Sequence, residues 1–157
     1  MDWVGFSRVT GDQAWNRTMK YTIFPEDRLV VVKFEGCVTI DKIAAYASAL
    51  LADPGFHRTF REVVDLTDVV DFRIEAKEAI ALADRIDPFA RSTQRAFVVG
   101  SGAQYHVARM HQLLRGDGTK IGIFTSPEEA KRWMLNGEPA NPPGSIAEKR
   151  MSARSGK

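Results

Sequence analysis

Hydrophobic and polar positions along the chain change period several times, and the period indicates which segments form strands and which form helices. Residues Met19 to Phe24 and Leu29 to Glu35 are rich in β-branched and aromatic side chains, and a Pro-Glu-Asp-Arg turn separates them. This pattern predicts a hairpin. From Thr39, a candidate N-cap, apolar residues recur at the spacing of an amphipathic helix, which ends at the Asp-Pro-Gly sequence starting at Asp53.

A strand followed by a helix then repeats three more times. The strand candidates are 61–66, 95–100 and 120–124, and the helix candidates are 75–87, 103–115 and 127–135. The last helix has the clearest start, with Ser126 as N-cap and Pro127 at the first helical position. The predicted fold class is therefore α/β: an N-terminal β-hairpin followed by a four-unit β-α superhelix with a mainly parallel sheet, over residues 19–136.

The two ends of the chain depart from this pattern. Residues 1–18 carry Trp3, Phe6 and Trp15 among small and polar residues, and large aromatic side chains are costly to leave in water. We expect this segment to pack on the domain or on a second copy of the chain. Residues 137–157 combine Pro and Gly with a basic, serine-containing end, so we expect a flexible basic tail.

Composition and charge narrow the function classes. The chain has 157 residues, 44% hydrophobic and 27% charged, which is typical of one globular domain. The net charge is +2, and basic residues are concentrated in the tail, so the body is nearly neutral and we expect no nucleic-acid partner. The longest apolar run, four residues from Leu29, is too short for membrane insertion.

The single cysteine and the first residues of the chain indicate the cellular compartment in which we expect the protein. Cys37 has no intrachain disulfide partner, and the first residues, Met-Asp-Trp-Val-Gly, lack the pattern of a secretory signal. We therefore expect a soluble protein in the reducing cytoplasm. Cys37 ends an apolar run without a basic neighbour, which favours a buried, inert thiol.

Several stretches, taken in order, resemble the SpoIIAA-like branch of the STAS family, the anti-anti-sigma-factor-like superfamily that is related in fold to Sec14 domains. The resemblance covers roughly residues 19 to 136 and depends on order and spacing rather than on one motif. The stretches are Leu29–Gly36, Thr39–Phe56, Val63–Val69, Arg95–Val99, Ala108–Met110 and 120–134.

The resemblance implies a fold shared by bacterial anti-sigma antagonists, which bind protein partners, and lipid-carrying Sec14 domains. In the antagonists a kinase phosphorylates a serine at the start of the second helix. The corresponding residues here, Asp71 to Ala76, contain no serine or threonine. The resemblance therefore implies only a role in binding a protein partner that does not depend on phosphorylation.

Three aspartates at three-residue spacing follow the strand candidate 61–66. If Asp65, Asp68 and Asp71 lie beyond the carboxyl end of a parallel strand, they occupy the edge where α/β sheets place ligands, and two of them could bind a divalent cation. The alternative is that they cap turns and the next helix. Because no third ligand is evident, we expect no specific metal site and no cofactor.

A second candidate site lies between a strand and the helix that follows it. Backbone N–H groups of Gly100, Ser101 and Gly102 could hold an anion, or these residues form only a tight turn, since a dinucleotide fingerprint is incomplete. His106 and Arg109 lie one turn apart on the following helix and could assist, or they lie on a solvated shoulder.

Three function hypotheses remain. The first is a non-catalytic regulatory or protein-interaction module, with a homodimer as one form of association. The second is a domain that binds a small apolar ligand or a lipid, as Sec14 domains do. The third is an enzyme that uses the edge formed by Asp65, Asp68 and Asp71.

Right-handed crossovers running in one direction place helices on one face of the sheet and leave the other to be covered differently. We assign Phe97, Val99 and Phe124 to that second face, as an interface with residues 1–18 or with another copy. Deleting residues 1–18 should then lower the melting temperature, and it should either promote aggregation or change the oligomeric state. Unchanged melting and sedimentation of the truncated chain would contradict this expectation.

Overall fold

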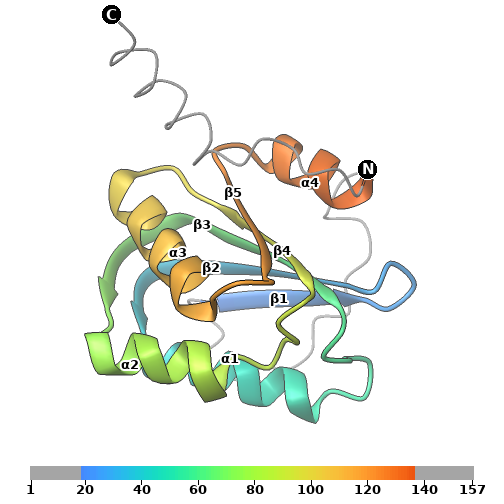
Figure 1. The fold of residues 1–157 in the computed structure, drawn as a ribbon, viewed down its shortest axis with the longest axis horizontal. Helices are drawn as coiled ribbons and strands as arrows, with labels where there is room; N and C mark the ends of the chain where they lie inside the picture. Colours follow the sequence, from blue (N-terminus) through green and yellow to red (C-terminus); the bar gives the residue numbers. More distant parts are fainter. Residues whose placement is uncertain (1–18, 137–157) are drawn as a thin grey trace, which may run out of the picture.

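The computed structural model describes residues 19–136 as one five-stranded sheet with helices on both faces (Figure 1). The strand order is β1-β2-β3-β4-β5, with β1 antiparallel to β2 and all other pairs parallel. The predicted α/β class, hairpin and four β-α units are confirmed. The elements are β1 (Met19–Phe24), β2 (Leu29–Thr39), α1 (Ile40–Ala52), β3 (Arg61–Arg73), α2 (Ala76–Ala81), η2 (Leu82–Ile86), β4 (Gln94–Val98), α3 (Gly102–Arg115), β5 (Lys120–Phe124) and α4 (Pro127–Asn136).

Two of the helix starts form as the sequence predicts. The hydroxyl of Thr39 accepts a hydrogen bond from the backbone N–H of Lys42 at 3.3 Å, which caps α1. The hydroxyl of Ser126 accepts from the N–H of Glu129 at 3.1 Å and caps α4. Within residues 19–136, no helix combines the length and the apolar character needed to cross a membrane.

The two faces of the sheet have separate hydrophobic clusters. Phe97 and Val99 belong to the cluster that also contains Tyr46 of α1 and Ala108 of α3. Phe124 belongs to the other cluster and packs against Trp133 of α4, with the ring centroids 5.3 Å apart. In Figure 1, α1, α2 and α3 lie together while α4 lies apart from them beside β5. Helix α4 therefore covers the second face.

This arrangement corrects one expectation. Phe97 and Val99 do not share a face with Phe124, and all three are buried, at 8%, 2% and 1% exposure. The expectation that every helix covers the same face is wrong, because the chain turns at Thr125 and Ser126 and places α4 on the opposite side from α3. The proposed anchors Trp3, Phe6 and Trp15, and the tail 137–157, lie outside the described residues.

Strands β2 and β3 extend well beyond the other strands. Their pairing shifts register twice, between Lys33 and Glu35 and between Gly36 and Cys37, and each shift places an extra residue in β3. Gly36 has a φ of 69°, a left-handed conformation that suits glycine. Cys37, expected to be buried, is half-buried here.

The predicted helix 75–87 is irregular. Helix α2 ends after six residues and continues as η2, a π-helical turn in which the N–H of Asp87 donates to the carbonyl of Leu82 at 2.9 Å. Single π turns are frequent at functional sites, because the extra residue re-aims the next part of the chain. In this chain the residue directly after the π turn is Asp87.

Gly122 gives a test of the packing under α4. A Cβ at this position would lie 2.7 Å from a ring carbon of Phe124, so Gly122→Ala should destabilise the fold by about 1–3 kcal/mol. Gly102→Ala is the matched control, because a Cβ there meets no atom within 4 Å. Urea unfolding measures both changes. Equal stabilities for the two variants would contradict the packing described for β5 and α4.

Candidate functional site

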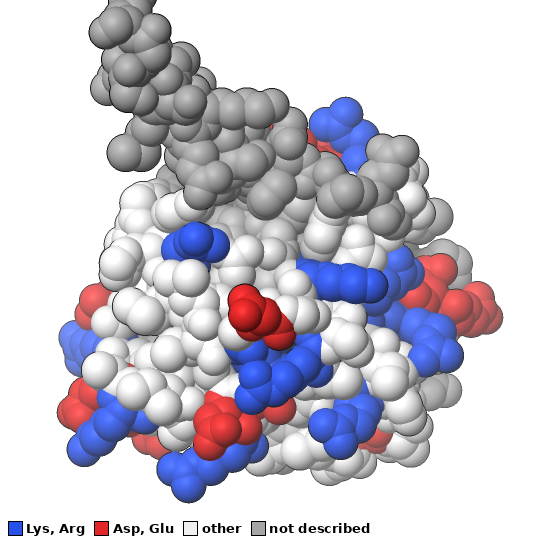
Figure 2. All heavy atoms as spheres, in the orientation of Figure 1, with Lys and Arg blue, Asp and Glu red and all other residues white. Residues whose placement is uncertain are grey.

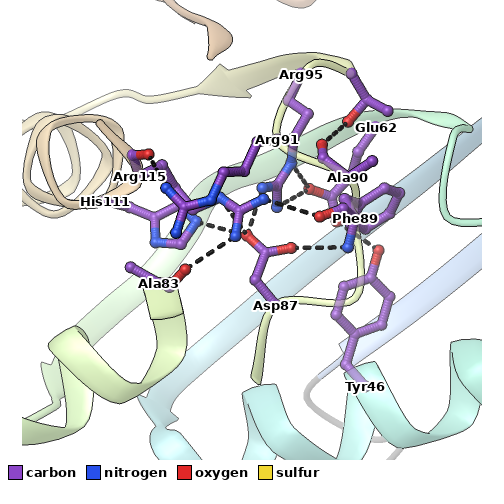
Figure 3. Close-up of polar contacts among 11 residues, drawn as sticks. Tyr46, Glu62, Ala83, Asp87, Phe89, Ala90, Arg91, Arg95, His111 and Arg115 are labelled. Carbon is purple, nitrogen blue, oxygen red and sulfur yellow. Dashed lines mark hydrogen bonds and ion pairs between the residues drawn. The ribbon is translucent and has the colours of Figure 1, made fainter. Parts of the chain in front are cut away.

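Six side chains with polar groups meet between the sheet and the helices α1, η2 and α3 (Figure 3). They come from different parts of the chain, and we call them the ion network. Its members are Tyr46, Glu62, Asp87, Arg95, His111 and Arg115.

Arg95 of β4 lies at the centre of the ion network. Its Nε and Nη2 both donate to Oε1 of Glu62, at 3.0 and 2.7 Å, and its Nη1 donates to Oδ2 of Asp87 at 2.5 Å. The guanidinium carbon lies 4.8 Å from the ring centroid of Phe89, a cation–π contact. The hydroxyl of Tyr46 donates to the second oxygen of Glu62 at 2.7 Å. Both oxygens of Glu62 are thus engaged.

Asp87 joins the network to α3. Its Oδ2 lies 2.9 Å from Nε2 of His111 and 3.6 Å from Nε of Arg115. Its Oδ1 accepts from the backbone N–H of Phe89 at 3.0 Å. The side chains of Asp87 and Glu62 are each only 1% exposed, so these contacts replace water almost entirely.

Arg115 fastens the segment that carries Asp87. Its Nη1 and Nη2 donate to the carbonyl oxygens of Ala83 and Phe89, at 2.9 and 2.8 Å. Its Nε is buried without a hydrogen-bond partner, although it lies near Asp87. Burial lowers the pKa of Arg115, and Asp87 opposes this effect.

The electrostatics of the network hold its members in defined protonation states. Burial alone would raise the pKa of Asp87, but Arg95, then His111 and Arg115, lower it well below its ordinary value. Burial would likewise lower the pKa of Arg95, and Glu62 and Asp87 raise it instead. Burial, followed by the charge of Glu62, raises the pKa of Tyr46 well above its ordinary value. The network therefore holds an ionised aspartate, a charged arginine and a neutral phenol.

A cavity of about 90 Å³ lies against one side of the network. Tyr46, Glu62, Asp87, Arg95 and His111 form its polar wall. The remaining walls are mainly apolar and come from the sheet, α1, η2 and α3. They include Phe34, Ile43, Val64, Leu66, Leu82 and Val107.

The aspartates singled out from the sequence lie elsewhere. Strand β3 continues to Arg73, so Asp65, Asp68 and Asp71 lie within the strand. The sequence predicts that they lie beyond its end, and that prediction is wrong. Asp65 accepts from the N–H and hydroxyl of Thr67, at 2.9 and 2.6 Å. Asp68 pairs with Lys33 at 2.8 Å, a hydrogen bond that raises the pKa of Lys33.

Asp71 forms an ion pair with Arg73 at 3.1 Å, and it does not cap the second helix. Glu75 takes that position and forms a reciprocal capping box with Glu78. Among the described residues, no three His, Cys, Asp or Glu side chains are placed to hold a metal ion.

The glycine-rich turn is already occupied by a side chain of its own helix. The N–H of Gly100 donates to Oε1 of Gln104 at 2.6 Å, and Ser101 caps α3 by accepting from the N–H of Gln104. The amide nitrogen of Gln104 donates to the carbonyl of Val69 at 2.9 Å, so this turn fastens α3 to β3. A Cβ added at Gly102 would meet no atom within 4 Å.

His106 and Arg109 contribute to neither the turn nor the cavity. His106 is exposed, and Nη1 of Arg109 donates to the side-chain oxygen of Gln112 at 2.5 Å. On the face drawn in Figure 2, basic and acidic side chains are interspersed, and neither sign forms a continuous patch.

The ion network was missed from the sequence, although a signal was present. Glu62, Val64 and Leu66 share one face of β3, and Arg95 lies on the same face of β4 as Phe97. A charged residue on the buried face of each of two strands requires a partner. His111, to which the sequence assigns no role, was missed as well, as were Tyr46, Asp87 and Arg115.

No family model matches this chain, and no curated protein matches it. A search of solved structures finds an uncharacterized protein of the DUF3478 family with a SpoIIAA-like fold, from Shewanella loihica PV-4. It is 14% identical, with a TM-score of 0.48, and the match covers 68% of this chain and 83% of that one. This is the fold named by the resemblance found in the sequence. The likeness transfers no residue role and no activity.

Asp87→Asn tests the ion network. Loss of the carboxylate charge leaves Arg95 and Arg115 buried with less compensation, so unfolding should become easier by about 3–5 kcal/mol. Because the pKa of Asp87 is lowered by folding, its contribution is present above a pH of about 4 and is lost as the pH falls further. The variant should therefore lose less stability than the wild type below that pH.

Asp68→Asn is the matched control, since Asp68 is exposed and its ion pair with Lys33 contributes at most about 1 kcal/mol. Chemical unfolding at several pH values measures both variants. If the two substitutions cost the same, the buried network does not hold this part of the fold together.

Proposed function

We propose that the described domain is a non-catalytic binding module that takes a small, mainly apolar molecule into the cavity beside the ion network. The observation that carries this proposal is the cavity itself: apolar side chains on most walls and a fixed polar group of residues on one. Such a combination is typical of small-molecule sites, where apolar area gives affinity and a few polar atoms give orientation.

The size of the cavity limits the ligand. At about 90 Å³ it is somewhat smaller than the apolar cavity of about 150 Å³ that is known to admit benzene in another protein. Apolar walls without a packing partner lose dispersion contacts, and an apolar ligand restores them. The proposed ligand therefore has about the volume of a single ring or a short branched chain.

Two features favour binding over catalysis. Among the described residues that line the cavity there is no serine, threonine or cysteine to act as a nucleophile. The carboxylate of Asp87 is held by Arg95 and by further hydrogen bonds that lower its pKa, which makes it a poor proton acceptor, and both oxygens of Glu62 already accept hydrogen bonds within the network. The polar wall is thus suited to bind and orient a ligand rather than to catalyse a reaction.

A regulatory role fits this proposal. A SpoIIAA-like domain without a phosphorylatable serine at the start of its second helix needs another input, and ligand occupancy under α1 and α3 would supply one. The protein partner, homodimer and cytoplasmic location expected from the sequence remain predictions, as does an enzyme acting through the β3 aspartates.

Val107→Phe tests the proposed cavity. Val107 is half-buried on α3 and lines the cavity, so a larger side chain there should fill the space. With the full chain and benzene as the probe, NMR titration should show shifts of the cavity methyl groups in the wild type. The variant should bind benzene at least about tenfold more weakly, a loss of at least ~1.4 kcal/mol.

Leu113→Phe on the same helix is the control, because Leu113 is 59% exposed and does not line the cavity. It should bind benzene like the wild type. A wild-type protein whose cavity methyl groups do not respond to benzene would overturn the proposal, and so would equal weakening by both variants.

A further inference from the structure

The hydrogen bonds of the polar wall restrict the chemistry of the ligand. We infer that the cavity takes an uncharged molecule that carries a hydroxyl group, and that this hydroxyl donates a hydrogen bond to Nδ1 of His111. The inference rests on the proposed function and names the class of ligand for the same cavity.

Most donors of the polar wall are directed at the network itself. The hydroxyl of Tyr46 donates to Glu62, and each of the three nitrogens of Arg95 donates to Glu62 or Asp87. An acceptor group on the ligand would have to compete with a carboxylate for these donors, which charge-assisted hydrogen bonds make unfavourable. Three of the five N–H groups of Arg95 are used in this way, which leaves at most the other two for a ligand whose only polar atoms are acceptors.

His111 differs from the other members of the wall. Its Nε2 lies 2.9 Å from Oδ2 of Asp87, and the lowered pKa of Asp87 keeps that carboxylate ionised, so the oxygen only accepts. Nε2 must then carry the hydrogen, and in the neutral imidazole Nδ1 is an acceptor. No hydrogen bond within residues 19–136 engages Nδ1 of His111.

The ring of His111 lies at the cavity. His111 lines the cavity from α3, and its ring contacts the edge of Phe97 with the centroids 6.0 Å apart. Asp87 and Phe97 hold the ring in one orientation, and Nδ1 is not among the fully buried side-chain atoms that lack a partner, so it lies at accessible surface. A fixed acceptor in a mainly apolar cavity is suited to a single hydroxyl donor.

The charge balance of the network argues against an ionised ligand. Its buried members comprise two guanidinium groups, Arg95 and Arg115, and two carboxylates, Glu62 and Asp87. These formal charges cancel, so a carboxylate ligand would bring an unpaired charge into a mainly apolar space. A neutral alcohol or phenol avoids that cost.

Three probes of one ring size separate the alternatives: benzene, phenol and benzoate, each titrated into the full chain at about pH 8, where a histidine is ordinarily neutral. Phenol should bind about three- to tenfold more tightly than benzene, the contribution of one neutral hydrogen bond. Benzoate should bind more weakly than either. The titrations are followed by the cavity methyl groups, as for benzene alone.

The histidine nitrogens give a direct readout in the wild-type protein. With ¹⁵N-labelled histidine, the Nδ1 resonance of His111 should move on addition of phenol but not of benzene. The exposed His57 and His106 serve as internal controls and should not respond. In His111→Phe, phenol should lose its advantage over benzene while benzene still binds.

The outcomes distinguish this inference from the proposed function. If benzene and phenol bind equally and Nδ1 does not move, the inference fails while the binding cavity stands. If none of the three probes reaches the cavity, the proposed function fails. Tightest binding of benzoate overturns the inference, because the site would then select an anion. Should His111→Phe not fold, the wild-type titrations and the ¹⁵N readout decide.

Discussion

The double ion pair of Arg95 is the interaction on which the described structure depends. Its guanidinium, 7% exposed, lies between Glu62 of β3 and Asp87 at the end of η2, and an unpaired charge at this depth would cost several kcal/mol. Glu62 brings in Tyr46 of α1, and Asp87 brings in His111 of α3. One charged side chain thus sets the distance between the sheet and the helix layer, and with it the space that remains as the cavity.

A buried ion network is a weak source of net stability, because well-packed apolar side chains of the same volume are often as stable. Its presence within the apolar core between the sheet and helices α1 and α3 therefore calls for a different reason. Apolar side chains repack to fill a void, whereas hydrogen-bonded charges keep fixed positions. A wall built from Glu62, Asp87 and Arg95 keeps the cavity from closing, and an apolar wall would not. The buried charges, which add little net stability, thus form one wall of the cavity that supports binding.

The sequence predicts the parts of the fold that depend on local periodicity and misses those that depend on pairing between distant segments. Helix α1 and the N-terminal cap of α4 can be predicted because each depends on residues within a few positions of one another. The length of β3 cannot, because two bulges against β2 change its buried period from two to three at Leu66 and Val69. Because of the same bulges, the three aspartates pair with alternate residues of β2, namely Lys33, Glu35 and Cys37. Glu62 and Arg95, 33 residues apart, become meaningful only when their strands pair.

The irregular backbone segments are consistent with a functional role for the cavity. A regular α-helix through Leu82–Ile86 would lack the extra residue of the π turn, and each residue turns a helix by about 100°. Asp87 would then point away from Arg95, and His111 would lose the partner that fixes its ring. The π turn disrupts the regular hydrogen bonding of a helix, so its position one residue before Asp87 needs a compensating gain. Local structure that departs from its regular form is concentrated where a site is built. Here the π turn places the carboxylate of Asp87 beside His111 and so orients the histidine ring on the polar wall of the cavity.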